Sequence, residues 1–348
     1  MAIWLARAGS HGEYEQKFVE DKKIYLTWDA LSEDISALDR SGLYQRLSQL
    51  YPTTKPRAIS NWTGQIWSFT KEMKKGDIVG IPSKSQPVIF FYEVVGDYVH
   101  EIKAQHPFYH SRQVKLLAEV PRSHLRQDIL YSFGAFLTIC RISRNDAEAR
   151  IERMRNNGWK SESTNSIISQ VVSSDEEIEE SLNIEEIAAE QISRLIISKF
   201  KGHGLTRLVD AILRAQGYTT YLSPEGPDGS VDILAGGGRL GFVEPRLCVQ
   251  VKSQDNPIEL RSITELQGAM TNVKATHGLF VSWNGYKRSV THSVITAHFF
   301  NVRLWTQYDV VRELYANYDR LDEEIKAELP LKRIWIVASQ GDKMEDDE

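Results

Sequence analysis

The first 155 residues alternate short apolar runs with polar turns, which is the pattern expected of β-strands. Such runs occupy residues 2–9, 23–28, 76–82, 87–99 and 113–120. Two amphipathic stretches, Ser32 to Leu50 and Ala58 to Lys74, interrupt the strands and are predicted to be helices. Many short strands with few helices favour a small β-barrel or a strongly curved sheet decorated by helices.

From Ile184 onward the hydrophobic pattern changes to that of an α/β domain. Helical spacing of apolar residues runs through 184–200, 203–218 and 259–275, and apolar strands are expected at 231–236, 247–253, 278–283 and 302–306. The glycine-rich run 236–241 predicts a hairpin turn, because it lacks the lysine and the following helix of a phosphate-binding loop. The pattern predicts a mixed central sheet flanked by helices.

The stretch between these two patterns is rich in serine and acidic residues, as is typical of a linker. We therefore expect four parts: a recognition domain at 1–157, the linker at 158–183, a catalytic domain at 184–335 and an acidic tail at 336–348. The chain has a net charge of −5, and its excess of acidic residues lies in the linker and the tail. The two domains are close to neutral, which permits nucleic-acid binding without arguing for it.

Cysteine content and hydropathy narrow the cellular setting. Only two cysteines occur, Cys140 and Cys248, and their spacing supports neither a disulfide framework nor a zinc site. The chain has no basic start followed by a sustained apolar run, and no stretch of 18 apolar residues. We expect a soluble protein of the reducing cytoplasm with no membrane association.

Polar residues interrupt two of the strands predicted in the second domain. Asp232 stands between Val231 and Ile233, while Gln250 and Lys252 alternate with valines in the strand that follows. Because side chains alternate across a strand, Gln250 and Lys252 project from the same face. If the two strands are neighbours, Asp232 converges on the same patch.

An acid, an amide oxygen and an ammonium group together suit phosphodiester hydrolysis. Asp232, the Gln250 side-chain oxygen and the backbone carbonyl of Val251 are hard oxygen ligands of the kind that Mg²⁺ prefers, and Mn²⁺ is expected to substitute. A bound metal activates water and offsets phosphate charge, and Lys252 is expected to orient the nucleophile or stabilise the phosphate. Since Gln250 is neutral, the site should bind metal more weakly than a two-carboxylate site.

Residues 200 to about 315, with "GPDGSVDIL", "CVQVKS" and "GLFVSW" in this order, resemble the catalytic domain of the Mrr family of restriction endonucleases. This family is a branch of the PD-(D/E)xK nucleases in which glutamine replaces the second acid. The resemblance implies that Asp232, Gln250 and Lys252 are catalytic, that the substrate is DNA and that cleavage depends on Mg²⁺. It also implies a restriction-endonuclease-like α/β fold.

One position departs from the family pattern. The family usually carries a glutamate on the first helix, where this chain has Thr206. Asp210, one turn later, is a candidate substitute for that acid, and so are Asp228 and Glu225 in the turn before Asp232. After the strand at 278–283, Lys287 and Arg288 are candidates for contacts with DNA phosphates, although a solvated loop is almost equally consistent with them.

The N-terminal strands "WLARAG", "KKGDIVGIP" and "FFYEVVGDYV" resemble PUA-like and EVE-like barrels, an α+β fold. Such barrels sometimes precede nuclease domains and hold a flipped, modified base by stacking and edge hydrogen bonds. By this resemblance, Trp28, Trp62 and Tyr98 are candidate pocket walls, and Arg7, His110 and Arg112 are candidate polar contacts. Most aromatic residues of a barrel belong to its core, so a core role is the alternative for each.

The sequence as a whole predicts a Mg²⁺-dependent DNA endonuclease that restricts modified or foreign DNA in prokaryotic defence. A homodimer and a partner protein of a defence system are possible partners by analogy with fused nucleases. Three alternatives stay open. They are a repair nuclease specific for DNA structure, a nuclease effector switched on by a nucleotide signal, and a DNA-binding sensor that has lost the chemistry.

Overall fold

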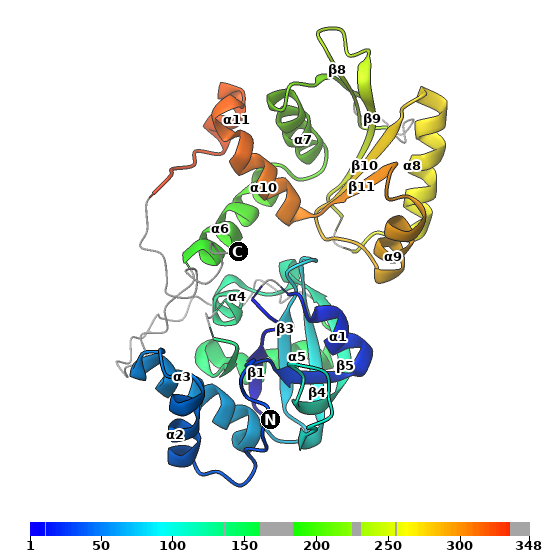
Figure 1. Cartoon of the computed structure of the whole chain (residues 1–348). Helices are drawn as coiled ribbons and strands as arrows, with labels where there is room; N and C mark the ends of the chain where they lie inside the picture. Colours follow the sequence, from blue (N-terminus) through cyan, green and yellow to red (C-terminus); the bar gives the residue numbers. More distant parts are fainter. Residues whose placement is uncertain (11, 135–136, 161–183, 225–230, 255, 335–348) are drawn as a thin grey trace. The chain divides into compact units, whose positions relative to one another are not determined.

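The computed structural model describes residues 1–10, 12–134, 137–160, 184–224, 231–254 and 256–334. The chain divides into two compact units, Met1–Asn183 and Ile184–Glu348 (Figure 1). The expected linker at 158–183 lies, apart from its first three residues, outside the described residues, and so does the tail at 336–348. Across the described ranges, the chain contains no helix that is both long and apolar enough to span a membrane.

The N-terminal unit is built on one sheet of six strands in the order β2-β5-β4-β3-β1-β6. Only the β1–β3 pair is parallel. The strands are β1 Ile3–Ala6, β2 Lys23–Leu26, β3 Ile78–Pro82, β4 Val88–His100, β5 His110–Pro121 and β6 Ile139–Arg141. The strands predicted from the alternating pattern are confirmed, and the three-residue β6 was not predicted.

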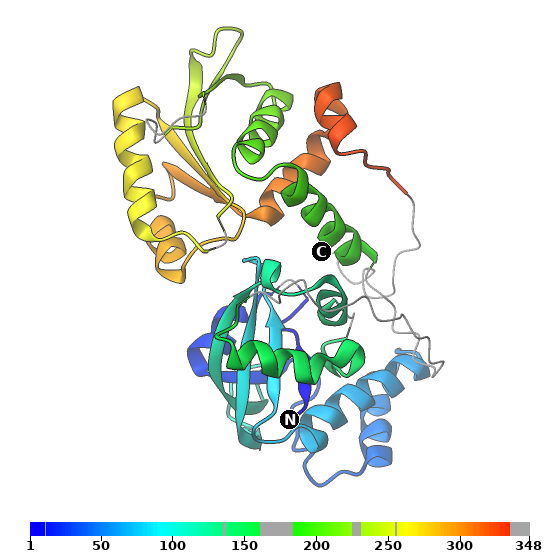
Figure 2. The same cartoon turned by 180° about the vertical axis from the view of Figure 1, so that it is seen from behind.

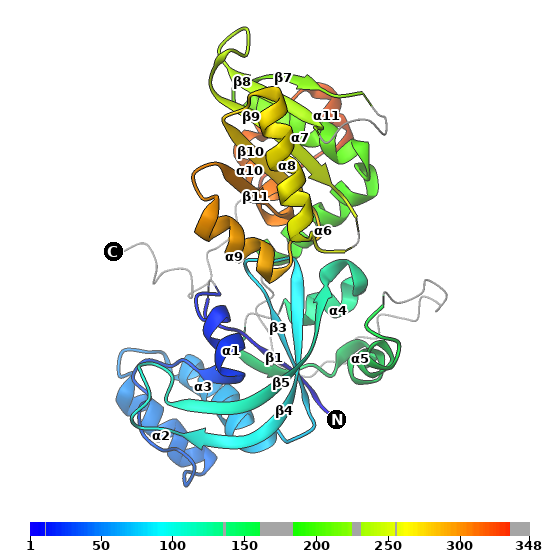
Figure 3. The ribbon, with the colours of Figure 1, turned by 90° about the vertical axis from the view of Figure 1, so that its right-hand side faces the viewer.

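Helices cover both faces of this sheet (Figure 3). On one face lie α1 Glu15–Asp21, α2 Arg40–Leu50 and α3 Pro56–Trp67, and α3 continues into the π-helical turn η1 Ser68–Glu72. On the other face lie α4 Gln127–Phe133 and α5 Ala147–Asn156. Side chains of β1 alternate between the two faces of the sheet. Trp4 and Ala6 belong to the core on the α1–α3 face, and Ile3 and Leu5 belong to the core on the α4–α5 face.

The sheet is open, with β2 and β6 as its two edge strands. The described residues therefore form no closed barrel, and the predicted PUA-like or EVE-like barrel is not shown. A small barrel encloses one core inside the sheet, whereas this sheet separates two cores and each is closed by helices. A curved sheet decorated by helices, the other option in the pattern, describes the unit better.

The C-terminal unit contains the mixed sheet that the sequence predicts, in the order β11-β10-β9-β8-β7. Strands β9, β10 and β11 run parallel, and β7 and β8 are antiparallel to their neighbours. The strands are β7 Thr219–Leu222, β8 Ile233–Gly237, β9 Val243–Lys252, β10 His277–Ser282 and β11 Val302–Trp305. Gly238, with a φ of +73°, lies in the turn of the β8–β9 hairpin, as the glycine run predicts.

Helices flank the C-terminal sheet on both faces (Figures 1 and 2). One face packs against α6 Ile184–Lys199, α7 His203–Ala215, α10 Gln307–Asn317 and α11 Glu323–Glu328. The other packs against α8 Leu260–Val273 and α9 Arg288–Ala297. Within β9, Val249 and Val251 belong to the α7 side, and Cys248 belongs to the α8 side. By alternation, Gln250 and Lys252 also project toward the α8 side.

We expect the core on the α8 side to contribute strongly to stability. Phe280 on β10 is fully buried there, whereas Phe300 is 82% exposed. Phe280→Ala should lower the free energy of unfolding by about 3 to 5 kcal/mol, because it leaves a cavity as well as losing apolar burial. Phe300→Ala, the same change at an exposed site, should cost much less in urea unfolding. Equal losses would contradict the assigned packing.

Candidate active site

The three residues singled out in the sequence meet at one edge of the C-terminal sheet. β9 and β10 are parallel and end together, since Gln250 pairs with Phe280 and Lys252 with Ser282. β8 runs the opposite way and begins at this edge, with Ile233 opposite Val249. Asp232, the residue before Ile233, therefore lies beside Gln250.

The backbone of β9 fixes the Asp232 carboxylate. Its Oδ2 atom accepts a hydrogen bond of 2.6 Å from the Val251 backbone N–H. The Asp232 backbone N–H donates in turn to the Val249 carbonyl at 2.9 Å. A charge-assisted bond of this kind holds one carboxylate oxygen in place. The second oxygen, Oδ1, has no hydrogen-bond partner among the described residues.

Gln250 carries the most informative atom of the site. The residue is only 4% exposed, and its Oε1 oxygen is buried without a hydrogen-bond partner in the described part of the chain. An unsatisfied buried oxygen costs about 1 to 3 kcal/mol, and such an atom calls for an explanation. A cation bound at this point would satisfy it.

Lys252 ends β9 at the same edge and is partly exposed. Its backbone carbonyl accepts a hydrogen bond from the Trp283 N–H at 3.0 Å, which ties the end of β9 to the loop after β10. Its ammonium group pairs with no carboxylate among the described residues. Lys252 is therefore a cation whose charge is available to an anionic ligand.

The residues present fit a divalent metal ion of the Mg²⁺ type. Asp232 and Gln250 offer hard oxygen donors side by side, and one of these oxygens is buried and unsatisfied. The described residues contain no group of three or more histidine, cysteine, aspartate or glutamate side chains able to hold a metal. The donor set is thus a small one, which the predicted Val251 carbonyl and solvent would have to complete.

Of the additional acids proposed from the sequence, Asp210 lies among the described residues. Asp210 is 5% exposed on α7, which packs against the Val249 side of the sheet, and its Oδ2 atom pairs with Arg214 at 2.9 Å. Thr206, at the family's acid position, is 3% exposed on the same helix. Asp228 and Glu225 lie outside the described residues. No hydrogen bond joins Asp210 to Asp232 or Gln250 within the described ranges.

The two basic residues predicted to contact DNA begin α9. Lys287 forms an ion pair with Glu259, and both side chains are more than half exposed. Arg288 is exposed at the first position of the helix. This placement leaves the role of both in DNA binding a prediction.

Of the aromatic residues predicted to form the N-terminal pocket, Trp28 and Trp62 contact each other and Tyr98 contacts His110. Trp28 packs edge to face on Trp62, with ring centroids 6.5 Å apart, and Trp62 also contacts Tyr51 at 5.1 Å. Tyr98 instead stacks on His110 and lines a separate cavity. Lysines of the 71–75 stretch, which the sequence reasoning passed over, line the same cavity. Three lysines within five residues was the feature of the sequence that could have indicated this cavity.

A comparison with protein families identifies the C-terminal segment. Residues 197–314 match the Mrr catalytic family, described as restriction endonuclease. This range carries a restriction endonuclease domain. The match suggests that the Mrr-type domain is an endonuclease, and it confirms the resemblance inferred over residues 200–315. Residues 3–130 match a family described only as a domain of unknown function, so the PUA-like or EVE-like resemblance is not confirmed.

Solved structures similar to the chain include restriction enzymes. "DNA modification-dependent restriction endonuclease AspBHI" is 12% identical, with a TM-score of 0.33, and the match covers 88% of this chain and 78% of that one. "MspJI Restriction Endonuclease in Complex with 27-mer Oligonucleotide" is 14% identical with a TM-score of 0.31, covering 73% and 61%. TM-scores this low do not establish a shared arrangement of the chains. No curated protein matches the chain.

Cys248 lies on the α8 side of β9, as Gln250 does. The reactivity of its thiol therefore reports on the burial of this strand face. Burial, with a smaller contribution from the Asp232 carboxylate, raises the pKa of this thiol to about 11. At pH 8 the thiolate fraction is then about one in a thousand, so we expect the buried Cys248 thiol to be unreactive.

In a Cys140→Ser variant, whose only thiol is Cys248, iodoacetamide at pH 8 should not alkylate the folded chain. The same variant unfolded in urea should react fully, which serves as the internal control. Rapid alkylation of the folded variant would show that the thiol is exposed and would contradict the burial of this strand face.

Proposed function

We propose that the protein is a Mg²⁺-dependent DNA endonuclease whose site is formed by Asp232, Gln250 and Lys252. The observation that carries the proposal is the buried, unsatisfied Gln250 oxygen beside a carboxylate held by backbone. It lies within the segment that matches the restriction endonuclease family. A buried oxygen that accepts no hydrogen bond lowers the stability of the fold. A bound metal ion would give the Gln250 oxygen a partner.

Each residue has a distinct role in this proposal. Asp232 and Gln250 hold the metal, aided by the Val251 carbonyl, and Mn²⁺ can replace Mg²⁺. The metal, when bound, lowers the pKa of a water molecule and offsets negative charge on the phosphate. Lys252 positions a phosphate oxygen or the attacking water with its unpaired ammonium group. The Val251 N–H keeps the carboxylate oriented while substrate enters.

The N-terminal unit is proposed to choose the DNA. A separate folded unit with a cavity of its own is suited to a binding role that the catalytic edge does not perform. We propose modified or foreign DNA as the target, in prokaryotic defence. Because each chain holds one such site, a homodimer would allow both strands to be cut. A partner protein of a defence system belongs to the same hypothesis.

The central prediction concerns plasmid cleavage. The wild-type chain should cut with Mg²⁺ or Mn²⁺ and not with EDTA, while Asp232→Ala and Lys252→Ala should each lower the cleavage rate by about 100-fold or more, because each removes a group that stabilises developing charge. Matched controls are Glu265→Ala on α8 and Lys326→Ala on α11. Glu265 pairs with the exposed Arg261, and Lys326, whose side chain is 25% exposed, pairs with the exposed Glu323. Ion pairs with an exposed partner have little energetic value.

Unmodified and cytosine-modified plasmids are compared in the same assay, and faster cutting of modified DNA would support the proposed target. DNA binding without cutting under any metal would sink the enzyme assignment for this chain. Equal cleavage by wild type and Asp232→Ala would exclude this site as the catalytic one.

The neutral ligand gives a second prediction. Gln250→Glu should lower the Mn²⁺ dissociation constant by about tenfold, since it adds a negative charge to the ligand set. Gln250→Leu, which has no side-chain oxygen, should raise that constant. Calorimetry with Mn²⁺ and without DNA measures both, independently of activity. Identical Mn²⁺ binding by the two variants would show that the Gln250 oxygen is not a ligand.

A further inference from the structure

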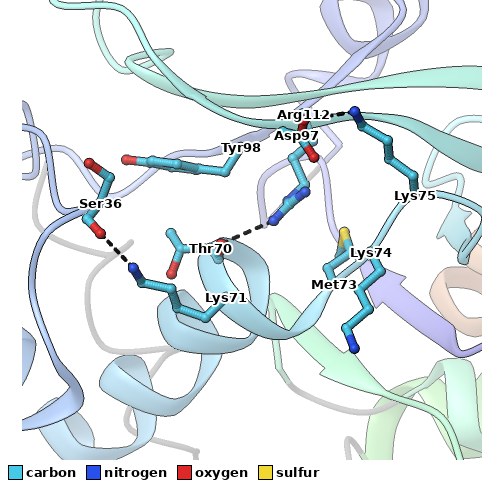
Figure 4. Close-up of a pocket in the computed structure, with 9 residues that line it drawn as sticks. All are labelled: Ser36, Thr70, Lys71, Met73, Lys74, Lys75, Asp97, Tyr98 and Arg112. Carbon is cyan, nitrogen blue, oxygen red and sulfur yellow. Dashed lines mark hydrogen bonds and ion pairs between the residues drawn. The ribbon is translucent and has the colours of Figure 1, made fainter.

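The cavity that Tyr98 lines in the N-terminal unit is cationic. It has a volume of about 560 Å³ and lies between η1 and the second half of β4 (Figure 4). Its charged lining consists of Lys71, Lys74, Lys75, Arg112 and Asp97. Four cations face one carboxylate, so the cavity carries an excess of positive charge. Its volume is within the range typical of small-ligand sites.

Arg112 on β5 holds the floor of the cavity and is 4% exposed. Its guanidinium donates to the carbonyls of Phe69, Thr70 and Gly96 at 2.6, 3.0 and 3.3 Å. An arginine has five N–H donors, so these three bonds leave two that are not taken up within the described residues. Burial lowers the pKa of Arg112, yet a guanidinium stays charged in proteins. A buried cation with spare donors favours an anionic ligand.

Two unusual backbone features meet at this arginine. The turn η1 is π-helical, with the Met73 N–H bonded to the Ser68 carbonyl at 2.9 Å. In β4, three residues (95–97) oppose the single residue Gln113 of β5, because Val94 pairs with Val114 and Tyr98 with Arg112. Gly96 is needed in this bulge, since a Cβ there would lie 2.8 Å from the Gln113 side chain. π-Helical turns and bulges are both frequent at functional sites.

The lysines differ in how far they are already engaged. Lys75 pairs with Asp97 at 2.7 Å, and Lys71 donates to the Ser36 carbonyl, as Figure 4 shows. The Lys74 ammonium has no partner within the described part of the chain. Figure 4 draws the Lys74 side chain running away from Arg112, so Lys74 reaches a ligand held by Arg112 only after its long side chain turns toward the cavity. The free ammonium and the spare guanidinium donors then suit a ligand with several anionic oxygens, which is the chemistry of a phosphate group.

The Tyr98 ring forms a fixed wall of the cavity. The His110 Nε2–H donates to the Leu31 carbonyl at 2.9 Å, so in the neutral ring Nδ1 accepts from the Tyr98 hydroxyl at 2.8 Å. Burial lowers the pKa of His110 to about 4, which keeps the ring neutral at physiological pH. A nucleotide has a planar base beside a phosphate group. An aromatic ring in the same cavity as several cations suits such a ligand, because bases stack on aromatic side chains.

We propose that this cavity binds a nucleotide through its phosphate group, with Lys74 and Arg112 as the phosphate contacts and Tyr98 beside the base. The nucleotide is either part of DNA or a free molecule. The proposal stands on the N-terminal unit alone and does not depend on the nuclease site. It gives that unit a chemical class of ligand that its family match does not supply.

The test is equilibrium binding by the full-length chain in EDTA, so that metal and cleavage play no part. The probes are free dCMP and a fluorescent DNA duplex. The variants are Lys74→Glu and Lys71→Glu, and the matched control is Lys115→Glu, an exposed lysine of β5 outside the cavity. Thermal unfolding of each variant checks that the fold is retained.

Lys74→Glu should weaken binding of at least one probe by about tenfold or more, because a charge-assisted contact is replaced by repulsion. Lys115→Glu should change it by less than about twofold. Lys71→Glu should act in the same direction as Lys74→Glu. If Lys74 contacts a phosphate of the duplex, the plot of the logarithm of the binding constant against the logarithm of salt concentration should lose about one unit of slope in Lys74→Glu.

The pattern of losses identifies the source of the nucleotide. Loss with the duplex supports the cavity as a DNA contact, and loss with dCMP alone supports a free nucleotide as the ligand. If neither probe distinguishes Lys74→Glu from Lys115→Glu, or if neither probe binds the wild-type chain, the proposal is overturned. Because no cleavage is measured, failure here is distinct from failure of the proposed nuclease.

Discussion

The hydrogen bond from the Val251 N–H to the Asp232 carboxylate is the interaction on which the candidate site depends. It exists because β8 begins at the edge where β9 ends. Asp232, the residue just before β8, therefore meets the backbone of Val251 near the end of β9. Without that register, Asp232 would face solvent and Gln250 would be an unexplained buried amide. The hairpin that joins β8 and β9 is therefore part of the site even though its turn lies at the opposite end of the strands.

The grouping of Asp232, Gln250 and Lys252 was predictable from the sequence because a strand has only two faces. Once 247–253 was assigned as a strand, Gln250 and Lys252 had to share a side, and an adjacent strand could bring only Asp232 to them. These three residues lie within the segment 197–314 that matches the restriction endonuclease family. The sequence could not show which acid, if any, replaces the residue at the Thr206 position, because Asp210 and Arg214 are equally well placed to form an ordinary helix ion pair.

In the N-terminal unit, the hydrophobic pattern predicted the strands but neither the closure of the sheet nor the cavity. Strand positions follow from alternation, but closure of a sheet depends on pairing between its edge strands, and the edges here are β2 and the three-residue β6. The cavity around Arg112 was equally hidden. It depends on a π-helical turn and a bulge, which are insertions of one or two residues into otherwise regular elements and leave no periodic signal.

Location of the metal tests the central claim most directly. Crystals of the full chain soaked in Mn²⁺ would show the ion by its anomalous scattering. The account predicts a peak about 2.0 to 2.4 Å from both an Asp232 carboxylate oxygen and Gln250 Oε1. A peak that leaves Gln250 Oε1 unbound, or one held at Asp210 instead, would contradict it.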